Sequence, residues 1–283
     1  MTYIDPIERA LIEAEVPTTK LEILYRRGDE KAYYFAVPGE EAEGIWYRLR
    51  DLVEQTGHWP VILGNSVVDI EQVRYDADEN RHGATESLIE KALKVSGSDL
   101  LEATYQSNIQ FHEKEVAKWK RKNIYPEDTA EFEKELAKPE PYRCMPIGKW
   151  DENAFPNMGF VSIYDYRTNL PHPTLYMGMI PTTISWQVPI HLRMGGWNAC
   201  PPPHEHGAVL RYWQEKYEAE VVCHRTDTLE LTVDSPPITE EESLALAREQ
   251  YLYCSDIVDQ GTGTIHALAG GLLDGETWYF WWD

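Results

Sequence analysis

The sequence closes with Trp278-Tyr279-Phe280-Trp281-Trp282-Asp283, an aromatic run that decides how the C-terminal part of the chain folds. Successive side chains of a strand point to opposite faces, so three of these rings face one way and two face the other. Because both faces of the run are apolar, we predict a central or covered β-strand. A plain aromatic core is the leading interpretation of these rings, and an aromatic binding pocket is the alternative.

Alternating apolar residues and turn signals predict further strands upstream of this run. Two hairpins are expected, one over residues 21–37 and one over residues 220–233. Thr239 followed by Glu242 has the spacing of a capping box, which predicts the start of a helix. A last helix is expected over residues 265–272. Other segments have the composition of strands, namely residues 59–63, 159–166, 174–180 and 183–193.

The middle of the chain differs in character from both ends. Glu, Lys and Asp dominate there, and apolar residues such as Leu88, Ala92 and Val95 recur at helical spacing. We therefore predict an α+β fold, a mixed or antiparallel sheet packed with helices and carrying a helical insertion. The predicted regions are an N-terminal αβ region (1–65), a charged helical insertion (66–140) and a C-terminal αβ module (141–283). The two αβ parts are expected to share one sheet or to pack tightly.

The bulk composition narrows the classes of function. The 283 residues carry a formal net charge of −22, which repels nucleic-acid phosphates and anionic membranes and favours a basic protein partner. Solubility alone is the competing explanation of this charge. The chain has no apolar run of about 18 residues, and its N-terminus does not resemble a secretory signal. Its four cysteines are widely spaced, which is typical of free thiols in a reducing compartment. We expect a cytoplasmic protein.

Three stretches of the C-terminal module resemble a bacterial family known as domain of unknown function 4253. The resemblance implies a related fold and a bacterial or phage origin, and it implies no activity. The stretches are Gly195-Gly196-Trp197-Asn198-Ala199-Cys200-Pro201 with Ala208-Val209-Leu210-Arg211-Tyr212-Trp213, then Leu244-Ala245-Leu246-Ala247-Arg248 continuing to Gly261, and the terminal aromatic run.

A small-molecule or catalytic site is one hypothesis for this module. Aromatic walls with an amide group are common in small-molecule sites, and paired carboxylates can serve in acid–base chemistry. Local capping and turn formation are the competing roles for the polar residues, and core packing is the competing role for the tryptophans. The candidate ligand-binding residues are Trp197, Asn198, Asp256, Asp259, Gln260 and Trp281.

Cys200, His204 and His206 form the candidate metal site. Thiolate and imidazole are zinc ligands, and one further ligand would complete a tetrahedral site. The two histidines are two positions apart at a predicted helix start, so they do not share a helix face. A capped helix N-terminus with exposed histidines is therefore the leading interpretation, zinc is the alternative, and no cofactor is predicted.

No stretch carries a catalytic signature, and the sequence decides neither for nor against an enzyme. The leading hypothesis is a cytosolic protein that binds a basic partner protein through an acidic surface, in the manner of an immunity or anti-defence factor. The alternative is an enzyme or small-molecule binder with an aromatic pocket near Trp197 and Asp256.

Overall fold

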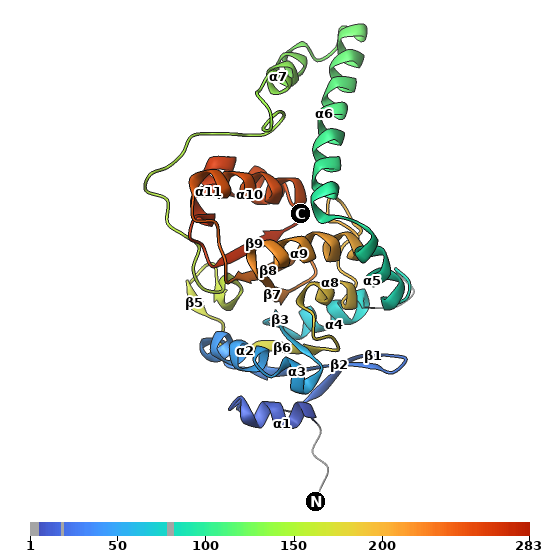
Figure 1. The fold of residues 1–283 in the computed structure, drawn as a ribbon, viewed down its shortest axis with the longest axis vertical. Coiled ribbons are helices and arrows are strands. Elements are labelled where there is room, and N and C mark those ends of the chain that lie inside the picture. The colour runs from blue at the N-terminus through green and yellow to red at the C-terminus, as the bar shows by residue number, and fades with distance from the viewer. Residues whose placement is uncertain (1–5, 18–19, 78–81) are drawn as a thin grey trace, which may run out of the picture.

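A computed structural model describes residues 6–17, 20–77 and 82–283 of the chain. Its centre is a seven-stranded mixed sheet in the order β1-β2-β6-β3-β7-β8-β9 (Figure 1). All neighbouring strands are antiparallel except β3 and β7, which pair in parallel. The strands are β1 (Glu22–Arg27), β2 (Glu30–Val37), β3 (Trp59–Gly64), β6 (Leu175–Ile180), β7 (Ala219–His224), β8 (Thr228–Val233) and β9 (Thr277–Trp281).

The order of the strands joins the two predicted αβ parts in one sheet. β6 comes from the C-terminal part, yet it pairs with both β2 and β3 from the N-terminal part. β3 in turn pairs with β7, where Ile62 lies opposite Cys223. The predicted α+β class with a mixed sheet is confirmed, and the strand order shows that the two parts form a single sheet.

Helices cover both faces of the sheet and one of its edges. α2 packs on β3, where the Trp46 indole N–H donates to the Pro60 carbonyl at 2.9 Å. α9 packs on β7 from the opposite face, and α10 with α11 lies beyond β9 (Figure 1). The helices of the body are α1 (Pro6–Glu13), α2 (Ala42–Arg50), α3 (Val53–Thr56), α4 (Val67–Asp76), α8 (Val188–His191), α9 (Pro203–Tyr217), α10 (Glu240–Tyr253) and α11 (Ile265–Leu272).

The terminal aromatic run forms β9, at the edge of the sheet rather than in its middle. Trp278, Phe280 and Trp282 are buried on the face that α9 covers. There the Trp213 ring stacks on Phe280, with the ring centroids 5.6 Å apart and the planes 10° apart. The run is therefore a covered strand, and the leading interpretation of these three rings as an aromatic core agrees with their burial.

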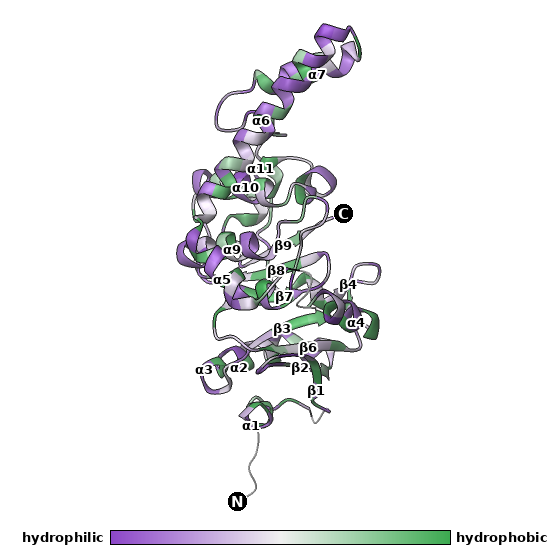
Figure 2. Ribbon diagram, turned by 90° about the vertical axis from the view of Figure 1, so that its right-hand side faces the viewer, coloured by the Kyte–Doolittle hydropathy of each residue, from purple (hydrophilic) through white to green (hydrophobic). Residues whose placement is uncertain are grey.

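The predicted insertion of residues 66–140 contains α4, which packs on β3 and β1 of the body, followed by α5 (Thr85–Lys94), α6 (Gly97–Lys122) and α7 (Pro126–Leu136). The base of α6 packs on α9, because Gly97 permits a close approach. A Cβ at Gly97 would lie 2.5 Å from the Ala208 carbonyl oxygen. The outer part of α6 pairs with α7 and projects from the body as an arm, whose surface is largely hydrophilic (Figure 2).

Residues 137–163, here called the strap, return the chain from the arm to the sheet. Gly270 and Gly271 of α11 lie directly beneath the strap, beside Ala154 and Asn157. The Asn157 N–H donates to the Gly271 carbonyl at 2.8 Å, and the Asn157 carbonyl accepts from the Glu276 N–H at 2.9 Å. The two glycines make this close contact possible, because they carry no Cβ.

Two strand predictions were wrong. Residues 159–166 hold a 3-10 turn at Val161–Ile163 and only the two-residue strand β4 (Tyr164–Asp165), which pairs with β5 (Leu170–Pro171). Residues 183–193 form the 3-10 turn Ser185–Gln187 and α8. Periodicity cannot separate a short buried helix from a buried strand, and a proline suits the first turn of α8.

Within the part of the chain that the structure describes, no helix has both the length and the apolar character needed to cross a membrane.

Candidate functional site

Three of the predicted ligand-binding residues meet at Asp283. The side-chain amide of Asn198 donates to the Asp283 main-chain oxygen at 3.0 Å, and the Asp283 N–H donates to an Asp256 carboxylate oxygen at 3.0 Å. The other Asp256 oxygen accepts from the Gln260 amide at 3.2 Å. These bonds tie the chain after β9 to the start of the π-helical turn Ile257–Thr262, although Asp256 makes no side-chain capping bond to that turn among the described residues.

The remaining three candidates lie in different surroundings. Trp197 is half-buried and forms an isolated bridge with Cys200. Asp259 lies on the same π-helical turn, where partial burial and the neighbouring Asp256 raise the pKa of its carboxyl group. Trp281 lines a cavity of about 180 Å³ between β9 and the helices α10 and α11, and the other five candidates lie outside this cavity.

Two of the three predicted metal ligands lie close together, and the third lies apart from them. Cys200 Sγ lies 3.4 Å from His206 Nε2, and the Nδ1 atom of the same ring lies 2.5 Å from the Tyr253 hydroxyl. The His204 ring faces Glu205 instead, at 4.0 Å. The expectation of exposed histidines was wrong for His206, which is fully buried between Cys200 and Tyr253. Burial lowers the pKa of His206 to about 3, so the ring is neutral at physiological pH. Residues 6–17, 20–77 and 82–283 contain no group of three His, Cys, Asp or Glu side chains placed to hold a metal ion.

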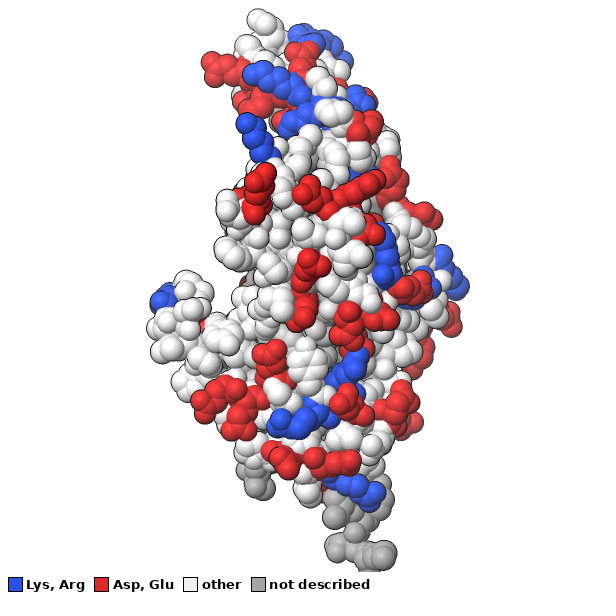
Figure 3. Space-filling view, turned by 60° about the vertical axis from the view of Figure 1, so that its left-hand side comes forward, with Lys and Arg blue, Asp and Glu red and all other residues white. Residues whose placement is uncertain are grey.

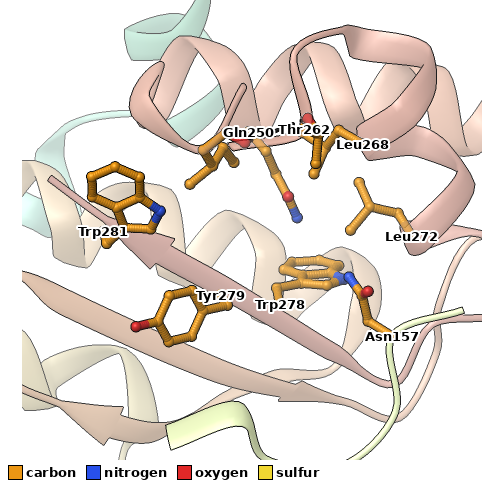
Figure 4. Close-up of a pocket in the computed structure, with 9 residues that line it drawn as sticks. Asn157, Gln250, Thr262, Leu268, Leu272, Trp278, Tyr279 and Trp281 are labelled. Carbon is orange, nitrogen blue, oxygen red and sulfur yellow. Dashed lines mark hydrogen bonds between the residues drawn. The ribbon is translucent and has the colours of Figure 1, made fainter. Parts of the chain in front are cut away.

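The 180 Å³ cavity draws its walls from the covered edge of the sheet and from the strap (Figure 4). Gln250 enters from α10, Leu268 and Leu272 enter from α11, and Asn157 comes from the strap. A signal for Gln250 was present in the sequence, because it falls on the apolar stripe of its helix between Leu246 and Tyr253. The complete lining is Asn157, Gln250, Ile257, Thr262, Leu268, Leu272, Trp278, Tyr279 and Trp281.

A second feature is an exposed apolar segment that the sequence analysis did not single out. The eighteen exposed large hydrophobic side chains of the described residues include six within residues 155–170. Phe155 and Tyr166 are 84% and 86% exposed, which is unusual for aromatic rings. The expectation of strands in this region hid the segment, because strand side chains are normally half-buried. Its members are Phe155, Met158, Val161, Tyr164, Tyr166 and Leu170.

A buried carboxylate holds this segment in place. Glu230 of β8 is fully buried and accepts the main-chain N–H groups of Val161 and Ser162 at 2.5 and 3.1 Å. Burial raises the pKa of Glu230 to about 7 even though these hydrogen bonds favour the charged form. Phe160 packs on the rings of Trp46 and Tyr47, each with centroids 5.6 Å apart. The exposed segment is thus anchored to both β8 and α2.

Three carboxylates lie near the strap or near Tyr47, which packs on Phe160. Glu276 is bonded through its N–H to the strap, while Glu43 and Asp234 lie near Tyr47, and Asp234 also pairs with Arg50 at 3.5 Å. Partial burial and the charge of Glu276 raise the pKa of Glu43. Neither Glu43 nor Glu276 has an ion-pair partner among the described residues. Figure 3 shows this side of the molecule, with broad uncharged areas between scattered carboxylates.

The comparisons with known proteins concern the C-terminal part of the chain. Residues 176–283 match the model of a family described as a domain of unknown function, DUF4253. The match spans β6, β7, β8 and β9 with the helices between them, and the resemblance seen in the sequence is confirmed. No curated protein matches the chain, and no solved structure matches it.

Proposed function

Residues 176–283 match a family that is described without a function, so we propose a function from the geometry and charge of the chain. The protein binds a basic partner protein through the docking face. This face consists of the six exposed apolar side chains of residues 155–170 and the carboxylates of Glu43, Asp234 and Glu276. The observation that carries the proposal is the concentration of exposed apolar side chains on one anchored segment.

The apolar part of the docking face supplies the attraction. Exposed apolar patches rimmed by polar groups mark protein-interaction sites, whereas single exposed hydrophobic residues are ordinary. Aromatic side chains dominate the energetics of such interfaces, and Phe155, Tyr164 and Tyr166 offer three rings. Because Glu230 and Phe160 hold the segment, little conformational freedom remains to be lost when a partner binds.

The carboxylates of the docking face define the charge of the partner. Partial burial and the charge of Glu276 both raise the pKa of Glu43, and neither carboxylate has an ion-pair partner among the described residues. A Lys or Arg of a partner would relieve this repulsion. The net charge of −22 would also speed the approach of a basic protein at low ionic strength. Factors of the immunity or anti-defence type act by binding in this way, and we place the protein in that class.

The cell compartment is part of the same proposal. The described chain holds four free thiols, of which Cys200, Cys223 and Cys254 are buried. Free thiols of this kind suit the reducing interior of a bacterial cell, so the cytoplasm is the proposed location.

Affinity capture from the source lysate at low salt, followed by calorimetry with the purified partner, tests the proposal. We expect a stoichiometric basic protein on the wild-type chain and on Leu93→Ser, which removes a 52% exposed side chain on α5 instead. Phe155→Ser combined with Tyr166→Ser should weaken binding by at least 30-fold, which is the loss of about 2 kcal/mol typical of one hot spot. Capture of no stoichiometric protein, or equal affinity for all three chains, would refute the proposal.

A second pair of variants separates charge from apolar contact. Glu43→Gln combined with Glu276→Gln keeps the shape of the docking face and removes its unpaired charges. We expect slower association and a weaker dependence of the affinity on salt. The matched control is Glu86→Gln on α5, which should bind the partner with the same salt dependence as the wild type. If the affinity of the partner changes neither with salt concentration nor with the double substitution, charge does not select the partner.

A further inference from the structure

The cavity of about 180 Å³ lies on a covered sheet edge whose main-chain groups are directed into it. The Trp282 N–H donates to the Asp227 carbonyl across the sheet at 3.0 Å. The even-numbered residues of this run therefore direct their main-chain N–H and C=O groups toward β8. The odd-numbered residues direct their main-chain N–H and C=O groups away from β8, toward α10 and α11. The Trp281 carbonyl accordingly accepts from Cys254 Sγ at 3.0 Å. The N–H and C=O of Tyr279, a lining residue, therefore face the same side.

Two buried side-chain donors also meet at this cavity. Gln250 is 1% exposed and Trp278 is 0% exposed. Gln250 Nε2 and Trp278 Nε1 have no hydrogen-bond partner among the residues that the structure describes. Figure 4 shows the Gln250 amide projecting from α10 toward the Trp278 ring, whose nitrogen lies on the side of Asn157. A buried donor left without a partner destabilises the folded chain, so both groups favour a ligand that offers acceptors.

The walls set the size and the charge of that ligand. Ile257, Leu268, Leu272 and the tryptophans give an apolar surround, and none of the lining side chains is charged. A dry cavity of about 150 Å³ accommodates benzene, so 180 Å³ is suitable for one substituted ring. A carboxylate would lose its hydration here without meeting a cation, which disfavours an acid.

We propose that this cavity binds a neutral single-ring cyclic amide, a flat heterocycle with adjacent ring N–H and C=O groups like those of a pyrimidine base. The amide edge of the ring would pair with the N–H and C=O of Tyr279, as a neighbouring strand would. A second carbonyl on the ring would accept from Gln250 Nε2 and Trp278 Nε1. The proposal is independent of the docking face, because it rests on different residues and needs no partner protein.

Calorimetric titration with uracil, toluene and benzoate tests the chemical class. The three rings are similar in size, but only uracil is a neutral cyclic amide. We expect binding of uracil and none of benzoate or toluene at the same concentration. Gln250→Met removes the donor at similar volume and should weaken uracil binding roughly 5- to 10-fold, which is the value of one hydrogen bond between neutral groups. Gln214→Met on α9 is the matched control and should bind as the wild type does.

A third variant and an NMR measurement on the unmodified chain distinguish a loss of binding from misfolding of a variant. Leu272→Trp fills the cavity and should abolish binding of uracil. In the unmodified chain, saturating uracil should shift the indole N–H resonance of Trp278, which is buried at the cavity, more than that of Trp46, which already donates to Pro60. Absence of uracil binding at millimolar concentration, binding that survives both substitutions, or preference for toluene or benzoate would each overturn the proposal.

Discussion

Replacing Glu230 by Gln should remove a defined part of the pH dependence of stability. The carboxyl group is fully buried on β8, and burial raises its pKa from an ordinary value of 4.5 to about 7. A raised pKa means that the folded state binds the proton more tightly than the unfolded state. Stability therefore falls as pH rises from about 4.5 through about 7, because the folded chain must then hold a buried charge.

The magnitude follows from the two pKa values. If the pKa of the carboxyl group rises from about 4.5 in the unfolded chain to about 7 in the folded chain, the full effect on the free energy of unfolding is about 3 kcal/mol, and most of it falls between pH 5 and pH 8. Gln cannot ionise, so Glu230→Gln should lose that part of the slope. The neutral amide keeps one carbonyl oxygen to accept from Val161 or Ser162.

Urea unfolding of the wild type and of Glu230→Gln at pH 5 and pH 8 measures this quantity. The change in unfolding free energy between the two pH values is compared between the two proteins. Val221→Ala on β7 is the control, because it removes buried methyl groups from a fully buried side chain without removing a titratable group. It should lower stability equally at both pH values. If Glu230→Gln shows the same change in unfolding free energy from pH 5 to pH 8 as the wild type, the pKa of Glu230 is not raised in the folded chain.

Three further substitutions test the packing. Gly97→Ala should destabilise the chain by about 1–3 kcal/mol in urea unfolding, because its Cβ would meet the Ala208 carbonyl oxygen and force α6 from α9. Trp213→Ala should cost about 3–5 kcal/mol, seen as a large fall in Tm, and a fall of a few tenths of a kcal/mol would contradict its place in the core. Gly270→Ala places a methyl group against Ala154 and should speed trypsin cleavage of the strap, while an unchanged rate would show that the strap does not rest on α11.

Local signals in the sequence were sufficient for most elements. The capping pattern at Thr239 predicted the start of α10, and the Thr239 hydroxyl indeed accepts the Glu242 N–H at 3.2 Å. Alternation predicted the hairpins β1–β2 and β7–β8, because each hairpin is closed by a short turn. The class of the fold and the aromatic character of β9 were accessible for the same reason: they depend on periods of two to four residues along the chain.

The candidate sites depended on contacts between distant residues. Trp281 and the amide of Gln250 share a cavity only because α10 and α11 fold over the edge of β9. The docking face depends on Glu230, which is far from Val161 in sequence and accepts its N–H. No local period encodes such a pairing, so the candidate residues predicted from the sequence lie around Asp256, which instead accepts hydrogen bonds from Gln260 and Asp283.

The sequence by itself determined most of the element types, the acidic charge and the resemblance of residues 176–283 to a family of unknown function. Only the tertiary structure decided the order of the strands, with β6 between β2 and β3, and the position of the terminal aromatic strand at a covered edge. Local propensity depends on neighbours in the chain, whereas pairing and burial depend on which surfaces meet after the chain has folded. The exposed rings of residues 155–170 and the unpartnered donors of Gln250 and Trp278 are properties of those surfaces.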